Sequence, residues 1–141
     1  MQLKAIPDTS LSSGELKLYA FSDNDLPLGC VELYNYDPVN RRAAVGLVVS
    51  NEHRHQGHGS AMIQQLTDFC LANTSLHQLY ADIAATNLPS LHIFQKAGYA
   101  HCATLKDWVL RGDKYIDTLR YQLILERPST PEDREAHTTN Q

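Results

Sequence analysis

The fold of this chain is decided by residues 45–62, which read Val45-Gly46-Leu47-Val48-Val49-Ser50-Asn51-Glu52-His53-Arg54-His55-Gln56-Gly57-His58-Gly59-Ser60-Ala61-Met62. An apolar run of strand length, 45–49, leads into a polar turn that contains two glycines. After Gly59 the apolar residues recur at steps of three and four, which predicts a helix with one buried face. Glycines let a backbone approach an anion closely, and the first N–H groups of a helix have no partner within it. A strand, a glycine-containing turn and a helix in this order therefore predict a phosphate-binding site.

The glycines of the turn are compatible with three phosphate-binding motifs, and a plain strand-to-helix turn is a further alternative. A Walker P-loop needs a Lys beside its last glycine, and this turn contains no Lys. A dinucleotide-binding fingerprint needs a third glycine, which is absent at the required spacing after Gly57 and Gly59. The third motif, Gln/Arg-x-x-Gly-x-Gly/Ala, is matched by Arg54, Gly57 and Gly59. It resembles the loop that holds the pyrophosphate of acyl-CoA in the GNAT superfamily of N-acyltransferases.

The composition indicates one globular domain. The chain has 141 residues, 43% of them hydrophobic, which is enough for a real core. Its net charge of −4 argues against nucleic acid as a partner and suits a cationic substrate. No apolar run approaches the length of a membrane span, and residues 1–13 lack the features of a signal peptide, so we expect a cytoplasmic protein without a membrane partner. Cys30, Cys70 and Cys102 are far apart and lie mostly within apolar runs, so we expect reduced core residues.

Apolar periodicity and turn signals predict an α/β fold with the order β-β-β-α-β-α-β-β. The expected strands are 16–21, 28–36, 41–49, 76–83, 99–106 and 114–125, the expected helices are 59–72 and 87–97, and 107–113 is expected as a connection. The unit from 41 to 83 should be a right-handed parallel crossover between antiparallel hairpins, which gives a mixed sheet covered by helices. The expected organisation is a short segment at 1–13, the domain at 14–126 and a disordered polar tail at 127–141.

Three blocks of sequence together resemble a GNAT N-acetyltransferase over about residues 14–125. The first is 41–49 with the Arg54-x-x-Gly57-x-Gly59 loop, the second runs from 87 to 99, and the third comprises 106–108, 112–117 and 121–123. The third block, with Tyr34-Asn35-Tyr36-Asp37-Pro38 upstream, resembles the branch of diamine/spermidine and ribosomal-protein alanine acetyltransferases. The resemblance implies a GNAT-like fold and transfer of an acetyl group from acetyl-CoA to a primary amine by direct attack in a ternary complex. A small amine or polyamine is the expected acceptor, with a protein N-terminus second.

The resemblance also implies where acetyl-CoA binds. The arm of the cofactor should lie where strands 45–49 and 78–83 splay apart, with the Leu47 N–H facing the thioester oxygen and Val49 bonding the pantetheine. Asn87 is expected both to cap its helix and to bond the pantetheine. The alternative for 47–49 is an ordinary core strand. The expected cofactor-binding residues are Leu47, Val48, Val49, Arg54, His55, Gln56, Gly57, His58, Gly59, Ser60, Asn87, Ser90, Phe94 and Lys96.

Three histidines of the turn, His53, His55 and His58, raise the alternative of a metal site. Their spacing of i, i+2 and i+5 lies in a turn, and no Cys or carboxylate cluster is fixed nearby. Exposed histidines beside a phosphate explain the pattern better, so no metal is expected.

Phe94 departs from the family pattern in a way that affects the chemistry. Many GNAT enzymes have a Tyr there that protonates the leaving thiolate, and Phe cannot do so. Ser90 lies four residues earlier on the same helix face, and it either passes a proton or only supports the helix start. Glu32 in mid-strand and Asp82 at a strand end are the candidate general bases, with a solvated carboxylate as the alternative for each. A catalytically poor acyl-CoA-binding module is the alternative function, and a purely structural interaction domain is a third.

The resemblance also points to an absence on the N-terminal side. Such enzymes usually begin with a strand and two helices that form one wall of the acceptor site, whereas residues 1–13 precede the first hairpin here. The chain is then a fragment, a short reading frame, or a divergent member that borrows a wall from a partner subunit. A sheet that starts at Leu16 would leave its first strand as an exposed edge. We therefore expect a homodimer through the 16–36 hairpin or through the 106–125 strands.

Overall fold

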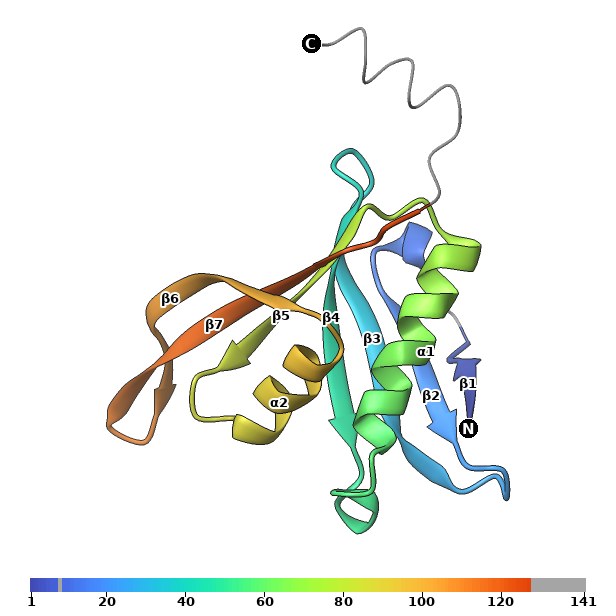
Figure 1. Cartoon of the computed structure of the whole chain (residues 1–141), viewed down its shortest axis with the longest axis horizontal. Helices are drawn as coiled ribbons and strands as arrows, with labels where there is room; N and C mark the ends of the chain where they lie inside the picture. The colour runs from blue at the N-terminus through green and yellow to red at the C-terminus, as the bar shows by residue number, and fades with distance from the viewer. Residues whose placement is uncertain (8, 128–141) are drawn as a thin grey trace, which may run out of the picture.

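Within residues 1–7 and 9–127, which the computed structural model describes, seven strands form one twisted sheet and two helices pack against it (Figure 1). The elements are β1 (Gln2–Ala5), η1 (Leu11–Ser13), β2 (Leu16–Phe21), β3 (Pro27–Asp37), β4 (Arg42–Val49), η2 (Asn51–His53), α1 (His58–Asn73), β5 (Gln78–Ala84), α2 (Leu88–Lys96), β6 (Ala100–Arg111) and β7 (Lys114–Ile124). The strands lie in the order β1-β2-β3-β4-β5-β7-β6, and only β4 and β5 are parallel neighbours. From β2 onward this confirms the predicted element order and the mixed sheet.

The two faces of the sheet differ in what covers them. Alternate strand residues point to opposite faces, and those on the first face, such as Leu18, Val31 and Val45, are buried. Met62 of α1 and Leu91 of α2 belong to the same buried cluster, so both helices cover this face. No helix of the described residues covers the opposite, helix-free face. The helix-free face carries the other alternate residues, including Lys17, Glu32, Tyr34, Tyr80 and Arg120.

β4 and β5 run parallel but pair over only a short length. Their register joins Arg42–Ala44 to Gln78–Tyr80. Beyond this point β4 continues beside β3 as far as Val49, whereas β5 continues beside β7 as far as Ala84. The two strands therefore splay apart from Val45 onward, as the diverging arrows of Figure 1 show. This is the splay that the family resemblance predicted.

Residues 2–5, which were expected to lie in an irregular segment, form β1. This strand pairs antiparallel with β2, from Gln2 opposite Phe21 to Ala5 opposite Leu18. The expectation that the strand at Leu16 is an exposed edge is therefore wrong, because β1 supplies its neighbour. Four residues with little alternation carry almost no strand signal, and here the open edge of β2 decides their conformation. Residues 2–5 therefore belong to the same sheet as the rest of the domain.

The expected connection at 107–113 is mostly strand. β6 continues to Arg111, and β7 begins at Lys114. The register passes from Leu105 opposite Thr118 to Val109 opposite Ile116, so residues 106–108 bulge against Asp117 alone. The Asp117 carboxylate accepts hydrogen bonds from the Asp107 N–H (2.9 Å) and from Lys106 Nζ (3.2 Å), which holds the bulge. Because a bulge interrupts the alternation, the sequence pattern indicated a loop here.

Arg127 is part of the ordered domain, although the predicted tail began with it. Its guanidinium donates to the carbonyl oxygens of Cys70 (3.2 Å) and Leu71 (2.8 Å) in the last turn of α1, and to that of Leu76 (3.0 Å) in the connection before β5. A cation is favourable there because the last carbonyl groups of a helix lack partners and carry partial negative charge. The rest of the predicted tail, 128–141, lies outside the described residues.

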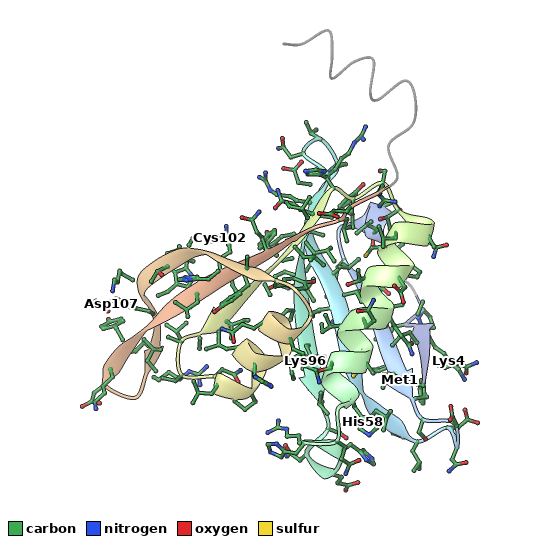
Figure 2. The ribbon with its side chains drawn as sticks, viewed as in Figure 1. Met1, Lys4, His58, Lys96, Cys102 and Asp107 are labelled. Carbon is green, nitrogen blue, oxygen red and sulfur yellow. The ribbon has the colours of Figure 1, made fainter. Side chains whose placement is uncertain are left out.

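The three cysteines have different surroundings. Cys70 is buried in the core, Cys30 is half-buried, and Cys102 is exposed on β6 at the outer edge of the sheet (Figure 2). Burial raises the pKa of the Cys70 thiol to about 12. All three are free thiols, but the expectation of a core position is wrong for Cys102. None of the described helices is both long and apolar enough to cross a membrane.

Candidate active site

A cavity of about 580 Å³ opens at the mouth of the splay, on the side that the helices cover. The end of β4, the turn after it, the first turn of α1 and one side of α2 form its walls. All but two of the predicted cofactor-binding residues line it: Leu47, Val48, Val49, Arg54, His55, Gly57, His58, Gly59, Ser60, Asn87, Ser90 and Lys96. Two separate sequence blocks therefore meet in one cavity, while their role in holding a cofactor stays a prediction.

Gln56 and Phe94 are the two residues that do not line the cavity. The Gln56 side chain lies against His58, with Oε1 3.2 Å from Nε2. Phe94 is only 3% exposed and packs edge-to-face on Tyr99, with ring centroids 5.0 Å apart. Phe94 is thus a core residue beneath the cavity.

Sequence reasoning did not include four further residues that line the cavity: His53, Pro89, His92 and Ile93. One signal was available on α2. His92 and Lys96 are four residues apart, so they share a helix face, and Lys96 was already among the expected residues. His58 at the first turn of α1 and Lys96 at the last turn of α2 are labelled in Figure 2.

The first turn of α1 is open toward the cavity. Gly57 is its N-cap residue, with φ +79°, and no side chain of the N-cap position bonds the turn. The N–H groups of His58, Gly59 and Ser60 are therefore without partners inside the helix, and all three residues line the cavity. His55 also has a positive φ of 64°, so the loop winds tightly before the helix begins. Open N–H groups at the positive end of a helix form a site for an anion.

Gly59 is needed for close packing rather than for its backbone angles. A Cβ at this position would lie 2.8 Å from Cδ1 of Ile93 on α2 and 3.5 Å from the side chains of Leu47 and Val49. The missing side chain lets the start of α1 lie directly against α2 and β4. The second glycine of the motif therefore sets the width of the cavity.

Positive and titratable side chains surround the open helix end. Arg54, Lys96 and four histidines line the cavity. Arg54 Nε donates to the Val49 carbonyl oxygen at 3.3 Å, which places the guanidinium over the end of β4. The rings of His53 and His58 meet edge-to-face at 6.0 Å. In the part of the chain that the structure describes, no cluster of His, Cys, Asp or Glu has the arrangement of a metal site.

The start of α2 is fixed by a side-chain cap. The Asn87 Oδ1 atom accepts a hydrogen bond from the Ser90 backbone N–H at 3.3 Å, and Pro89 occupies the first turn. The capping role predicted for Asn87 is confirmed. Asn87 and Ser90 line the cavity, so both side chains lie beside the splay. The Ser90 backbone N–H takes part in the cap, and Ser90 is the residue of α2 that was predicted to pass a proton in place of the usual Tyr.

The candidate general bases lie on the helix-free face, away from the cavity. Glu32 lies opposite Gly46 in the β3–β4 register and lines a second, shallow hollow of about 600 Å³ with Glu15, Tyr34 and Tyr36. Lys17 is the β2 neighbour of Glu32, but its Nζ pairs with Glu15 at 3.1 Å. No ion pair within the described residues involves Glu32.

Asp82 is held by Arg120. The guanidinium donates from Nε (2.7 Å) and from its terminal nitrogen (2.9 Å) to the two carboxylate oxygens. The same guanidinium lies over the Tyr80 ring, 4.6 Å from its centroid. Asp82 therefore belongs to a cross-strand network between β5 and β7, and its two oxygens are already engaged.

Comparison with protein families places these features in context. The model of the Acetyltransferase (GNAT) family matches residues 5–99. The chain belongs to the GNAT family. The matched range contains the splay, the open end of α1 and the capped start of α2, and it begins at the last residue of β1.

The relatives of this GNAT chain include spermidine N(1)-acetyltransferases. The protein from Vibrio cholerae is 23% identical over 97 residues, which is 69% of this chain and 56% of the relative. The protein from Escherichia coli K12 is 28% identical over 92 residues, which is 65% of this chain and 50% of the relative. The chain spans about half the length of these curated relatives. They agree with the branch that the sequence resembles.

Among solved structures, the fold resembles that of spermidine N-acetyltransferase from Vibrio cholerae in complex with CoA and spermine. The TM-score is 0.77 at 20% identity, and the match covers 81% of this chain and 68% of the other. At this identity the similarity establishes the fold, and the GNAT fold expected from the sequence is confirmed.

The helix-free face offers a direct test of how its side chains cluster. Burial raises the pKa of the Tyr34 phenol, and the carboxylates of Asp82 and Glu32 raise it further. Subtracting the absorbance titration curve of Tyr34→Phe from that of wild type isolates the ionisation of the Tyr34 phenol. The midpoint of this difference curve should lie above the usual tyrosine pKa of about 10. Glu32→Gln removes a negative charge near the phenol and should lower this midpoint. Glu52→Gln, on the turn after β4, is the control and should leave the midpoint unchanged. If Glu32→Gln also leaves the midpoint unchanged, the Glu32 carboxylate does not lie near the Tyr34 phenol.

Proposed function

We propose that this GNAT chain is an acetyl-CoA-dependent N-acetyltransferase that acts on a primary amine by direct attack in a ternary complex. The observation that carries the proposal is the splay of β4 from β5, with the cavity at its mouth and the open end of α1 beside it. Family membership and the spermidine acetyltransferases among the relatives support it. A small amine or polyamine is the proposed acceptor, with a protein N-terminus second.

The cofactor would bind mainly through backbone groups. From Gly46 onward the side of β4 that faces away from β3 has no strand beside it, so its N–H and C=O groups are free to bond the pantetheine amides, as an added strand would. The Leu47 N–H would face the thioester oxygen, and the N–H groups of His58 to Ser60 would hold the pyrophosphate. Arg54 would have to leave the Val49 carbonyl oxygen to add its charge to the phosphates.

Glu32 is the better candidate for the general base. Both carboxylate oxygens of Asp82 already accept hydrogen bonds from Arg120, so neither is free to face an amine. The Glu32 carboxylate lies on the helix-free face beside the splay, where an amine can approach. The amine nitrogen would attack the thioester carbonyl carbon and lose a proton to Glu32, directly or through one water, as the C–S bond breaks.

The leaving thiolate needs little help. A thiol has a pKa of about 8.5, so its anion is a tolerable leaving group. Phe94 has no proton to donate and is buried against Tyr99. Ser90 lines the cavity and would relay a proton from solvent water to the sulfur, to give free CoA and the amide while its own hydroxyl is restored. A catalytically poor acyl-CoA-binding module is the second candidate, because Phe94 removes the usual acid.

We also propose that the reaction needs no metal and that the protein works in the cytoplasm, with reduced thiols and without nucleic acid or membrane partners. The three free cysteines and the net charge of −4 support this. Thiol release should then be insensitive to a metal chelator.

Turnover is tested by thiol release from acetyl-CoA with a panel of amines, including spermidine and a peptide with a free N-terminus. We expect release with an amine present and a lower rate for Ser90→Ala, because general acid catalysis typically contributes about 10²–10⁴-fold. Equal rates would leave Ser90 with its part in the helix cap alone. Affinity for acetyl-CoA without release would support the binding module, and the absence of both would favour a structural domain.

The anion site is tested with two nearly isosteric substitutions. Gly57 has open space around it, and its φ of +79° is one that Asn and Asp tolerate better than other side chains. Gly57→Asp should lower CoA affinity by at least tenfold more than Gly57→Asn, because only Asp adds a negative charge at the phosphates. Calorimetry measures both affinities, and thermal unfolding checks that both variants fold. Equal losses would remove the phosphate assignment of this loop.

We propose that two copies associate through the β6–β7 strands. Trp108, Leu110 and Tyr115 on this hairpin are 64%, 57% and 63% exposed, and an apolar patch of this kind marks an interface. A two-fold dimer is the simplest arrangement. Light scattering at micromolar concentration should give twice the monomer mass for wild type and the monomer mass for Trp108→Ser/Tyr115→Ser. A monomeric wild type would contradict the dimer.

A further inference from the structure

Gly46 lies on β4 directly beneath the Glu32 side chain. A Cβ at Gly46 would lie 2.7 Å from Oε1, 2.8 Å from Cγ and 3.2 Å from Cδ of Glu32. The Cγ, Cδ and Oε1 atoms of the half-buried Glu32 therefore occupy the space that a side chain at Gly46 would fill. The glutamate lies across the neighbouring strand and still lines the shallow hollow.

The backbone of Gly46 does not explain why this residue is a glycine. Among the described glycines, 14, 57, 98 and 112 have positive φ angles, and Gly46 is not one of them. A glycine inside a strand weakens it, because it loses more conformational freedom on folding and packs no side chain. What the glycine provides here is space, and the Glu32 carboxylate occupies that space.

The position of this contact along β4 links it to the reaction. The last residue of β4 that pairs with β5 is Ala44, so Gly46 lies just inside the splay. The next residue is Leu47, which lines the cavity and whose N–H is the proposed partner of the thioester oxygen. The Glu32 carboxylate therefore lies one residue from that N–H, on the face opposite the cavity.

We propose that Gly46 is a positioning residue for the acetyl transfer: it lets the Glu32 carboxylate lie on β4 at the splay, where the attacking amine must lose its proton. This inference rests on the proposed function. Neither the glycine itself nor its position in the apolar strand indicated such a role in the sequence. An Ala at this position would meet the Glu32 side chain, from Cγ to Oε1, rather than backbone. Glu32 would move while the sheet keeps its register.

The test compares Gly46→Ala, Glu32→Gln and the double variant by steady-state thiol release. Gly46→Ala should lower kcat about 10- to 100-fold, since a displacement of about 1 Å costs up to about 10²-fold in other enzymes. The KM for acetyl-CoA and the CoA affinity should stay within twofold of wild type, because the cofactor lies on the other side of β4. In the Glu32→Gln background, Gly46→Ala should have no further effect, because the carboxylate it displaces is already gone.

The matched control uses the other carboxylate of the shallow hollow. Glu15 lines that hollow with Glu32 but does not contact Gly46, so the effects of Gly46→Ala and Glu15→Gln should multiply. Wild-type turnover in Gly46→Ala would overturn the inference and leave the proposed function standing. If the losses of kcat in Gly46→Ala and Glu32→Gln multiply in the double variant, Gly46 has only a structural role. An inactive wild type would overturn both.

Discussion

The structure depends on a single interruption in strand pairing. β4 and β5 are hydrogen-bonded neighbours as far as Ala44 and Tyr80, and beyond these residues each strand keeps only its other neighbour. Buried backbone N–H and C=O groups are almost always paired in folded proteins, so the exposed side of β4 is a row of groups that a ligand can satisfy. The opening is stable because β3 holds β4 over its full length and β7 holds β5. The cavity lies at this opening, and the proposed chemistry depends on it.

The two sides of the opening have different chemical characters. On the helix-covered side the site is made of backbone groups, glycines and positive charge, which suit the phosphates and amides of a nucleotide cofactor. On the helix-free side it is made of carboxylates and phenols, which suit an ammonium group. The splay is the place where the two sides can meet. A cofactor on one side and an amine on the other would then react through the gap between β4 and β5.

The cavity on the helix-covered side was predictable from sequence because it is built from local segments. The Arg54-x-x-Gly57-x-Gly59 turn and the Asn87 cap each lie within a few residues, so spacing alone indicated them. Phe94 was predicted from the family pattern to bind the cofactor, but it packs against Tyr99 and does not line the cavity, which a local pattern cannot indicate.

The side-chain arrangement on the helix-free face was not predictable in the same way, since it depends on contacts between distant strands. Asp82 and Arg120 are 38 residues apart, and nothing near either residue signals the pair. The contact between Glu32 and Gly46 follows from the β3–β4 register, and a hydrophobic pattern with a period of two excludes a slip by one residue but leaves slips by two open. β1 and the bulge at 106–108 escaped prediction for a related reason, because their conformations are set by neighbouring strands.

The central claim is that the gap between β4 and β5 holds the cofactor's arm, and a crystal structure of the chain with bound CoA tests it most directly. The account predicts pantetheine between residues 45–49 and 81–84, bonded to the backbone of β4, with the pyrophosphate at the first turn of α1. Arg54 should have left the Val49 carbonyl oxygen. CoA bound on the helix-free face would contradict the account. So would CoA bound elsewhere while β4 and β5 pair along the whole length of β4 and leave no gap.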